Sequence, residues 1–513
     1  MNARTTNVAE WILSGGRPDA PAILHGSRTT SYAALRRMAE GVAALLFDQG
    51  LAEGDRVALL AENGELFAAA YLGAIRLGVC MVPLQLDLAD ERLEEVLRNT
   101  GARRLLASER FVPRAAAIAA RVGIGIDGLT REDLDRPRAP RPPVEVDPRR
   151  DLAAIMLTSG STGDPKGVMV THRNIQCNTL DILDYMQLRP DDRAMVVLPF
   201  YYCYGASLLH THLAAGASLV INNRFMFPEK VLDEIEQRQC TGLAGVPSTY
   251  QILLRKTRLA QRRFPSLRWL QQAGGRLADV YIQEIRRALP DARLFVMYGQ
   301  TEATARLSYL PPERLDDKLG SIGRGLRSTR LEVLRGDGTP VAPGSDEVGE
   351  IVATGENIAP GYWDDPEETA RYFRNGRLYT GDLARVDSEG FIYIVDRARD
   401  FIKTMGNRVS PREIEDVLAE LPEVVEAAVV GAPDEILGEA PHAFIAPARP
   451  GALTVEAIHA HCLRRLPNYK IPAHVEFLAR LPKTPNGKIA RDALRADALA
   501  MAARRAQRAA GAG

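Results

Sequence analysis

An alternation of short apolar runs with helix-like segments constrains the fold of this chain more than any other feature. The strand-like run RVALLA (residues 56–61) is followed by ELFAAAYLGAIRLG, which has a helical pattern. The alternation returns from Asp151 to about Asp396, with strand-like runs at AMVVLPF, SLVI and LFVMY. Strands that alternate with helices are typical of α/β layers, so we predict buried sheets covered by helices.

The last hundred residues have a different character. FIYIV (residues 391–395) alternates like a strand, and the charged run DRARD (396–400) follows it. SPREIEDVLAEL (410–421) predicts a helix in which Ser410 and Glu413 form a capping box. Two strand-like runs, VEAAVVG and HAFIAP, then precede a helical segment around TVEAIHAHCLRRL.

We therefore predict a large α/β domain with layered subdomains and a small, mobile α+β domain. The large domain spans residues 1–398, the small domain 399–496, and an Ala/Arg tail 497–513. Within the large domain, the proline-rich stretch at 136–150 predicts an extended connector, because proline disfavours both helix and sheet ladder.

Composition and charge exclude several classes of function. The chain has 65 basic and 65 acidic residues, which argues against a nucleic-acid or anionic-membrane partner. The most apolar window (67–84) is interrupted by Arg76 and is too short to span a bilayer. Five scattered cysteines without CxxC spacing predict neither disulfides nor a zinc site, so we expect a cytoplasmic protein. The pairs His210/His212 and His459/His461 lack further ligands at metal spacing and predict packed or surface histidines.

The stretch 157-LTSGSTGDPKG-167 has the composition of a phosphate-binding loop. Its spacing is wrong for the P-loop of nucleoside triphosphatases, because Pro165 stands in the second glycine position and Gly167 follows the lysine. Glycines nevertheless allow backbone N–H groups to turn inward, hydroxyls add donors, and Lys166 adds a positive charge. Taken alone, a Gly/Ser-rich surface turn remains the alternative.

Five motifs in a fixed order resemble the adenylate-forming (AMP-binding) superfamily, of the acyl-CoA synthetase type. They are TSGSTGDPKG, 298-YGQTEA-303, 348-VGEIVATGENIAPGYWDDPEET-369, 379-YTGDLARVDSEGFIYIVDRARD-400 and 482-PKTPNGKIARDAL-494. The resemblance implies that a carboxylate attacks the α-phosphate of Mg·ATP to give an acyl-adenylate and pyrophosphate. A thiol then displaces AMP to give a thioester. The implied cofactors are ATP, Mg²⁺ and either coenzyme A or the phosphopantetheine of a carrier protein.

The same resemblance implies the residues that bind ATP phosphates. Lys488 would reach the α-phosphate and the attacking carboxylate, Thr301 would contact the α-phosphate, and Glu302 would hold Mg²⁺, which prefers oxygen ligands. These three residues form the expected catalytic set. The expected ligands of the β- and γ-phosphates are Thr158, Ser159, Gly160, Ser161, Thr162, Gly163 and Lys166.

The resemblance also implies an adenosine site and a hinge. The adenosine residues are Tyr298 beside the adenine, Gly274, Gly275 and Arg276 opposite it mainly through backbone, and Asp382 with Arg397 at the ribose. The small domain would rotate about Arg399, where relatives commonly carry Asp or Lys, so this position departs mildly from the pattern. Gly406 would then allow the pantetheine arm to approach closely.

The acid pocket is expected from segments 199–207, 245–250 and 271–275. Amino-acid-activating relatives bind the α-ammonium group with an aspartate where this chain has Cys203, and residues 199–207 contain no Asp or Glu. Because a buried cation without a partner is unfavourable, an α-amino acid is disfavoured, while fatty, aryl and polycyclic acids all remain open. The expected pocket residues are Tyr202, Cys203, Gly205, Ser248, Ala273 and Gly274.

The sequence therefore predicts a CoA ligase for a carboxylic acid that is not an amino acid. Two alternatives stay open. One is a ligase that loads a separate acyl carrier protein, and the other is a nucleotide-binding protein without turnover. The sequence does not specify the acid or the oligomeric state.

Overall fold

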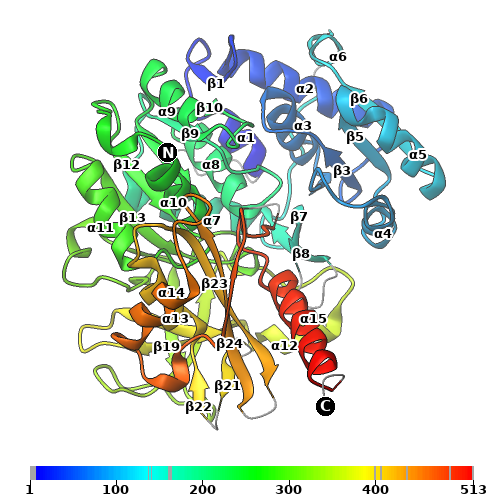
Figure 1. Ribbon diagram of the computed structural model, residues 1–513. Helices are drawn as coiled ribbons and strands as arrows, with labels where there is room; N and C mark the ends of the chain where they lie inside the picture. Colours follow the sequence, from blue (N-terminus) through cyan, green and yellow to red (C-terminus); the bar gives the residue numbers. More distant parts are fainter. Residues whose placement is uncertain are drawn as a thin grey trace.

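The computed structural model describes residues 7–136, 138–139, 141–159, 165–397, 400–404, 407–434, 437–484 and 487–510. Figure 1 shows the two large sheets and their helices in blue to green, with the small domain in orange and red below them. The predicted α/β architecture, a large N-terminal domain followed by a small C-terminal domain, is confirmed.

The largest sheet has nine strands in the order β15-β14-β13-β12-β11-β9-β10-β1-β2. The strands from β13 to β1 are parallel to one another, while β14 and β15 at one side and β2 at the other are added in antiparallel pairs. The carboxyl ends of β11, β12 and β13 therefore lie side by side, which is where α/β sheets bind ligands. The strands are β1 (Pro21–His25), β2 (Arg28–Ser31), β9 (Arg193–Val196), β10 (Ser218–Ile221), β11 (Gly242–Gly245), β12 (Trp269–Gln272), β13 (Arg293–Tyr298), β14 (Ser308–Leu310) and β15 (Arg324–Gly325).

A second sheet has six strands in the order β6-β5-β3-β4-β7-β8. All of its pairs are parallel except β7 with β8, which form a hairpin. The predicted glycine-rich stretch begins in β7 and ends in β8, and its residues 160–164 lie outside the described residues. The strands are β3 (Arg56–Leu60), β4 (Cys80–Pro83), β5 (Arg104–Ser108), β6 (Gly125–Leu129), β7 (Leu152–Ser159) and β8 (Pro165–Thr171).

Helices fill the space between these two sheets and cover their outer faces. In α3 every residue except Leu66 is buried, because this helix lies between the layers and has no solvent-facing side. The helices of the shared core are α1 (Val8–Leu13), α2 (Tyr32–Asp48), α3 (Glu65–Arg76), α7 (His172–Met186) and α8 (Cys203–Ala214). The outer helices are α4 (Asp90–Asn99) and α5 (Val112–Val122) on the six-stranded sheet, and α9 (Pro228–Gln237), α10 (Pro247–Lys256) and α11 (Asp279–Ala288) on the nine-stranded sheet.

The predicted connector, residues 136–150, contains no helix or strand among its described residues. Helix α6 (Arg131–Asp135) packs on α2, and residues 141–150 then contain neither helix nor strand. Single 3₁₀ turns occur at η1 (Glu109–Phe111), η2 (Leu259–Gln261), η3 (Thr301–Ala303), η4 (Pro312–Arg314) and η5 (Asn468–Lys470).

A third, antiparallel sheet follows the nine-stranded one and ends the large domain. It has the order β16-β17-β19-β18, with β20 also paired to β19. The elements are β16 (Thr329–Leu334), β17 (Gly349–Gly355), α12 (Pro366–Tyr372), β18 (Phe373–Arg374), β19 (Arg377–Val386) and β20 (Ile392–Arg397). The predicted strand at 391–395 is thus confirmed as β20.

The small domain is a sheet of order β22-β21-β24-β23, with β25 added to β24 and helices on its faces. The predicted helix after Ser410 is confirmed, but the capping box is wrong. The Ser410 hydroxyl donates to Asp396 Oδ2 at 2.6 Å, a charged acceptor, and Glu413 pairs with Lys470. The elements are β21 (Ile402–Thr404), β22 (Asn407–Val409), α13 (Pro411–Ala419), β23 (Val424–Asp434), β24 (Gly438–Pro447), α14 (Val455–Leu463), β25 (His474–Phe477) and α15 (Arg491–Ala510).

The expected Ala/Arg tail from residue 497 begins within a helix. One continuous helix, α15, begins at Arg491 and packs on β23, with Leu494 and Ala498 buried between them. The Ala/Arg-rich residues therefore continue a helix whose first turns pack on the small domain. In the described ranges, no helix is both long and apolar enough to cross a membrane. All five cysteines lie in those ranges, and each is buried and free.

Candidate active site

The segment after β13 turns sharply at the edge of the nine-stranded sheet. A Cβ at Gly299 would lie 1.9 Å from the Ala305 carbonyl oxygen, so only glycine permits this turn. Thr304 adopts a φ of 68°, a left-handed conformation that is strained for a β-branched residue. The turn points Thr301 inward, where its hydroxyl contacts Cys203 Sγ at 3.3 Å.

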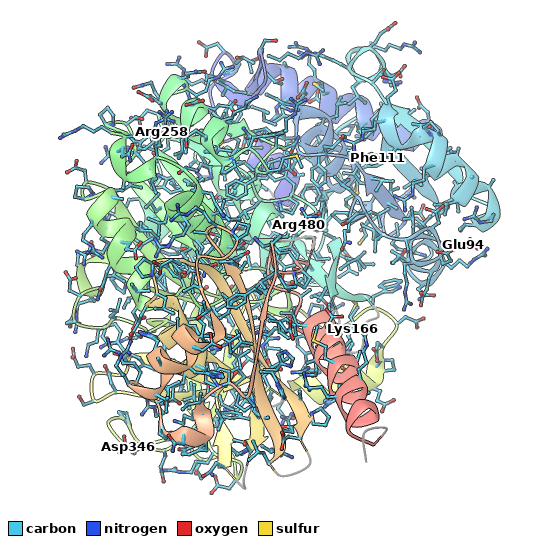
Figure 2. All side chains as sticks on the ribbon, in the orientation of Figure 1. Glu94, Phe111, Lys166, Arg258, Asp346 and Arg480 are labelled. Carbon is cyan, nitrogen blue, oxygen red and sulfur yellow. The ribbon has the colours of Figure 1, made fainter. Side chains whose placement is uncertain are left out.

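Glu302 and Lys166 lie on either side of one tyrosine. Tyr362 donates its hydroxyl to Glu302 Oε1 at 2.8 Å, and Lys166 Nζ lies 5.5 Å from the centre of the Tyr362 ring. Burial and the charge of Glu302 raise the pKa of the Tyr362 phenol, so it remains a donor. Lys166 also forms an ion pair with Glu368 of α12, and Figure 2 labels it at the lower edge of the six-stranded sheet.

The loop around Tyr362 is attached to the hairpin that carries Lys166. Met169 N donates to Gly361 O at 3.0 Å, and Trp363 N donates to Gly167 O at 2.7 Å. At the end of this hairpin, Thr158 pairs with Lys166 across the two strands. The remaining predicted loop residues Gly160, Ser161, Thr162 and Gly163 lie outside the described residues, and Ser159 ends β7.

Asp382, Tyr298 and Arg397 form a second cluster. Asp382 is 3% exposed and accepts hydrogen bonds from Tyr298 Oη at 2.6 Å and from Arg397 Nε at 3.2 Å. Cross-strand register places Asp382 directly opposite Arg397 in β19 and β20. The negative charge of Asp382 raises the pKa of Arg397, while burial and then Asp382 raise the pKa of Tyr298. The carboxylate is thus fixed as an acceptor.

Lys488 enters the large domain from the small one. A tight turn, in which Thr484 N donates to Lys488 O at 2.7 Å, presents the side chain. Lys488 Nζ donates to Tyr202 Oη at 3.2 Å, and Ser248 Oγ donates to the neighbouring Gly487 O at 2.7 Å. Gly274, with a φ of 87°, leaves room for the lysine, because a Cβ there would lie 3.2 Å from Lys488 Cε.

A few further contacts hold the small domain against the large one. Arg276 pairs with Asp416 of α13 and with Asp279 at 3.3 Å. Tyr281 Oη donates to the Val424 carbonyl at 3.1 Å, and Lys256 Nζ donates to the Ala448 carbonyl at 2.6 Å. The Arg276 side chain therefore lies at the domain interface, which leaves its backbone beside Gly275 for the expected adenosine wall.

The predicted acid-pocket residues gather around the start of α8. Cys203 is 5% exposed, and burial raises the pKa of its thiol, although Thr301 and the charges of Lys488 and Arg306 oppose this. Ser248 is buried in the first turn of α10, and Ala273 is buried directly after β12. Gly205 has a packing role, because a Cβ there would lie 1.9 Å from the Pro199 carbonyl oxygen.

Comparisons with known proteins identify the family. A family model described as AMP-binding enzyme matches residues 13–363, and one described as AMP-binding enzyme C-terminal domain matches residues 413–488. The chain belongs to the AMP-binding enzymes.

Similar proteins cover nearly the whole length of this AMP-binding enzyme. A feruloyl-CoA synthase from an Amycolatopsis species is 35% identical over 96% of this chain and 99% of that protein. The fatty acid–[acyl-carrier-protein] ligase ScoC from Streptomyces coeruleorubidus is 30% identical over 93% of each chain. The anthranilate CoA ligase AuaEII, solved in complex with anthranoyl-AMP, superposes with a TM-score of 0.90 at 26% identity, covering 97% of this chain and 98% of that one. The resemblance seen in the motifs is thereby confirmed.

Sequence reasoning missed several residues of this AMP-binding enzyme's site. Tyr362 and Glu368 lie within a quoted motif, yet nothing local to them indicates contact with Glu302 and Lys166. Arg306, 1% exposed beside Tyr204 and Gln271, was also missed. Its one signal is a lone arginine in the otherwise uncharged run ATARLSYL. The expected hinge Arg399 and channel residue Gly406 lie outside the described residues.

Proposed function

We propose that this AMP-binding enzyme is an AMP-forming acid–thiol ligase that joins a carboxylic acid to coenzyme A. In the first step a carboxylate oxygen attacks the α-phosphorus of ATP, and the bond to the leaving pyrophosphate breaks. In the second step the thiol sulfur attacks the acyl carbon, AMP leaves, and the thiol proton passes to solvent. The observation that carries the proposal is the docking of Lys488, from the small domain, against Tyr202 and Gly274 of the large domain.

The first step brings an anion onto a polyanion, so the site must neutralise charge. Lys488 and Thr301 act at the α-phosphate, while Lys166 and the 158–163 loop bind the β- and γ-phosphates. Lys166 exchanges Glu368 for phosphate, since both offer anionic oxygens that accept from an ammonium group. Glu302, oriented by Tyr362, supplies a hard oxygen ligand that suits Mg²⁺, and a bound Mg²⁺ would offset phosphate charge there.

The adenosine half is bound by residues that are already fixed in position. Asp382 uses one lone pair on each carboxylate oxygen for Tyr298 and Arg397, which leaves further lone pairs for two ribose hydroxyls. Gly274 and Gly275 lack side chains, so the base can approach their backbone closely. A buried, pre-oriented acceptor of this kind needs no reorganisation when the nucleotide binds.

The second step needs space for a thiol where Lys488 stands. The domain interface is a small set of separable contacts, among them Arg276 with Asp416 and Lys256 with the Ala448 carbonyl. Such an interface permits rotation of the small domain about Arg399, after which Gly406 lines the thiol channel. Coenzyme A is the favoured acceptor, because the similar feruloyl-CoA synthase and anthranilate CoA ligase are both CoA ligases. Similarity to the carrier-protein ligase ScoC keeps the phosphopantetheine of an acyl carrier protein as the second candidate.

The test is acid-dependent pyrophosphate release from ATP, with hydroxylamine to trap the acyl-adenylate. Lys488→Ala should lower the rate about 10²–10³-fold, the usual effect of losing one preorganised charge. Lys470→Ala is the matched control and should have little effect, because Lys470 pairs inside the small domain with Glu413, whose side chain is 45% exposed and can be solvated. Adding CoA or a phosphopantetheinylated carrier protein then identifies the acceptor. ATP binding without release for every acid tested would instead support a nucleotide-binding protein without turnover.

A further inference from the structure

Arg306 is a buried arginine whose backbone is fixed by two asparagines. Its carbonyl accepts from Asn178 Nδ2 at 2.8 Å and from Asn357 Nδ2 at 2.9 Å, and its N–H donates to Asn178 Oδ1 at 3.3 Å. It follows the strained turn at Thr304, and its side chain lies at the protein interior, 1% exposed. Backbone strain next to a buried charge is typical of a functional site.

The guanidinium of Arg306 has neutral neighbours. Its Nε donates to Tyr185 Oη at 3.3 Å, its Nη2 donates to Gln271 Oε1 at 3.4 Å, and its Cζ lies 4.7 Å from the centre of the Tyr204 ring. In the part of the chain that the structure describes, no carboxylate lies within ion-pair distance of it. A buried charge without an opposite partner is strongly unfavourable, and a guanidinium has five N–H donors to satisfy.

Two acidic side chains of this region, Glu302 and Asp181, have other partners. Glu302 is engaged by Tyr362. Asp181, on the same helix as Tyr185, accepts from Ser328. By contrast, the buried Arg76 pairs with Glu10 at 3.0 Å and with Glu40 at 3.7 Å. This fold therefore gives carboxylate partners to a buried arginine elsewhere, but not to Arg306.

Gln271 provides a second, independent observation. Because the guanidinium can only donate, Gln271 must turn its Oε1 toward Arg306 and its Nε2 away from it. That Nε2 is buried and has no hydrogen-bond partner among the described residues. Gln271 Nε2 therefore lacks an acceptor, and Arg306 beside it lacks an opposite charge, although buried donors and buried charges are normally paired.

These donors lie beside residues of the expected acid pocket. Tyr204 follows Cys203 at the start of α8, and Gln271 is separated from Ala273 by a single residue at the end of β12. The charge of Arg306 also acts on the Cys203 thiol, together with that of Lys488. The donors are thus next to the expected pocket residues Cys203 and Ala273.

We propose that Arg306 and Gln271 bind a second carboxylate on the acid substrate, so that the enzyme activates dicarboxylic acids at one end only. The proposal rests on the proposed ligase function. A carboxylate supplies the missing negative charge for Arg306 and the missing acceptor for Gln271, and a guanidinium binds it in a two-point geometry. The same charge repels an α-ammonium group, which agrees with the lack of an acidic residue around Cys203.

The test compares dicarboxylic acids with their monomethyl esters in the full-length enzyme. The panel holds glutarate, adipate, suberate and terephthalate, each beside its monomethyl ester, which has nearly the same shape but a neutral far end. We expect kcat/KM for pyrophosphate release to be about 10²-fold higher for the best diacid than for its ester. Arg306→Met should reverse this preference, whereas Tyr185→Phe, which keeps the charge, should retain it.

Binding is measured in parallel, so the result does not depend on turnover. Calorimetric titration of each diacid into the AMP-saturated enzyme should show binding that is lost in Arg306→Met. Release that favours the esters in the wild-type enzyme, or equal diacid binding by both proteins, would overturn the dicarboxylate proposal and leave the ligase function standing. Arg306-dependent diacid binding without release would support the pocket assignment and count against the ligase function.

Discussion

At the scale of single residues, the proposed ribose site depends on Asp382. Its carboxylate accepts from Tyr298 on one oxygen and from Arg397 on the other, in a buried setting. Hydrogen bonds to a charged acceptor are stronger than neutral ones, so the charge of Asp382 is what its partners recognise. The ribose hydroxyls would be recognised in the same way.

Replacing Asp382 by asparagine keeps the shape and removes the charge. We expect the KM for ATP to rise about ten- to a hundred-fold, the value of one or two charge-assisted hydrogen bonds. Unfolding by urea should change little, because the Arg397 side chain is 45% exposed and can be solvated. The measurement is pyrophosphate release against ATP concentration. Tyr298→Phe, which removes one neutral donor, should have a smaller effect, and an unchanged KM in Asp382→Asn would contradict the ribose assignment.

At the scale of elements, the start of α8 depends on one close approach. Gly205 packs on the carbonyl of Pro199, which belongs to the backbone and cannot turn aside as a side chain could. The approach sets where α8 begins and so places Tyr202 and Cys203 in the site.

Gly205→Ala should therefore destabilise the protein. A methyl group 1.9 Å from a carbonyl oxygen forces the helix to shift, and we expect a loss of about 1–3 kcal/mol or more in the free energy of unfolding. Gly336→Ala is the control, because nothing lies within 4 Å of a Cβ there. Urea unfolding curves of the two variants measure the difference. Equal midpoints would show that α8 adjusts without strain.

Elements that local sequence encodes were predictable, and contacts between distant segments were not. The apolar runs around 194–200, 218–221 and 294–298 became β9, β10 and β13, because a buried parallel strand needs only a short apolar run. The predicted helix does begin after Ser410, but the Ser410 hydroxyl donates a hydrogen bond to Asp396, across the predicted domain boundary. No local pattern could indicate that partner.

The site divides in the same way. The motifs predicted Glu302, Asp382 and Lys488, and the structure brings each of them to the edge of the nine-stranded sheet or to its interface with the small domain. Arg306 could not be predicted, because an isolated arginine is normally exposed and its contact with Gln271 joins segments 35 residues apart. Burial of a charge is a property of the assembled fold.

At the scale of the whole molecule, docking of the small domain carries a titratable group. Asp416 lies at the interface beside Arg276, and burial there raises its pKa from 3.8 to about 6, even though Arg276 opposes the shift. The docked arrangement therefore binds a proton more tightly than the separated domains do. By linkage, docking is favoured as pH falls through about 6 and is weakened as pH rises above it.

We expect the rate of adenylation, relative to the rate of thioester formation, to rise as the pH is lowered from 7 to 5. The reason is that adenylation needs Lys488 docked against the large domain. A third of the Asp416 side chain is exposed, so the effect should be only about two- to five-fold. Energy transfer between fluorophores on the two domains, recorded against pH, measures docking directly. Asp416→Asn should flatten the curve, and an unaltered curve in that variant would assign the pH dependence to another group.

Cys203 places a sulfur of the enzyme's own beside Thr301, where the acyl-adenylate would form. An acyl-adenylate is a mixed anhydride and acylates any thiolate that it meets. Because burial raises the pKa of Cys203, its thiol stays protonated and reacts poorly. An ionised cysteine here would be acylated by the enzyme's own acyl-adenylate, and the enzyme would be inactivated after one turnover. Burial of Cys203 thus reserves the activated acyl group for the sulfur that arrives from outside.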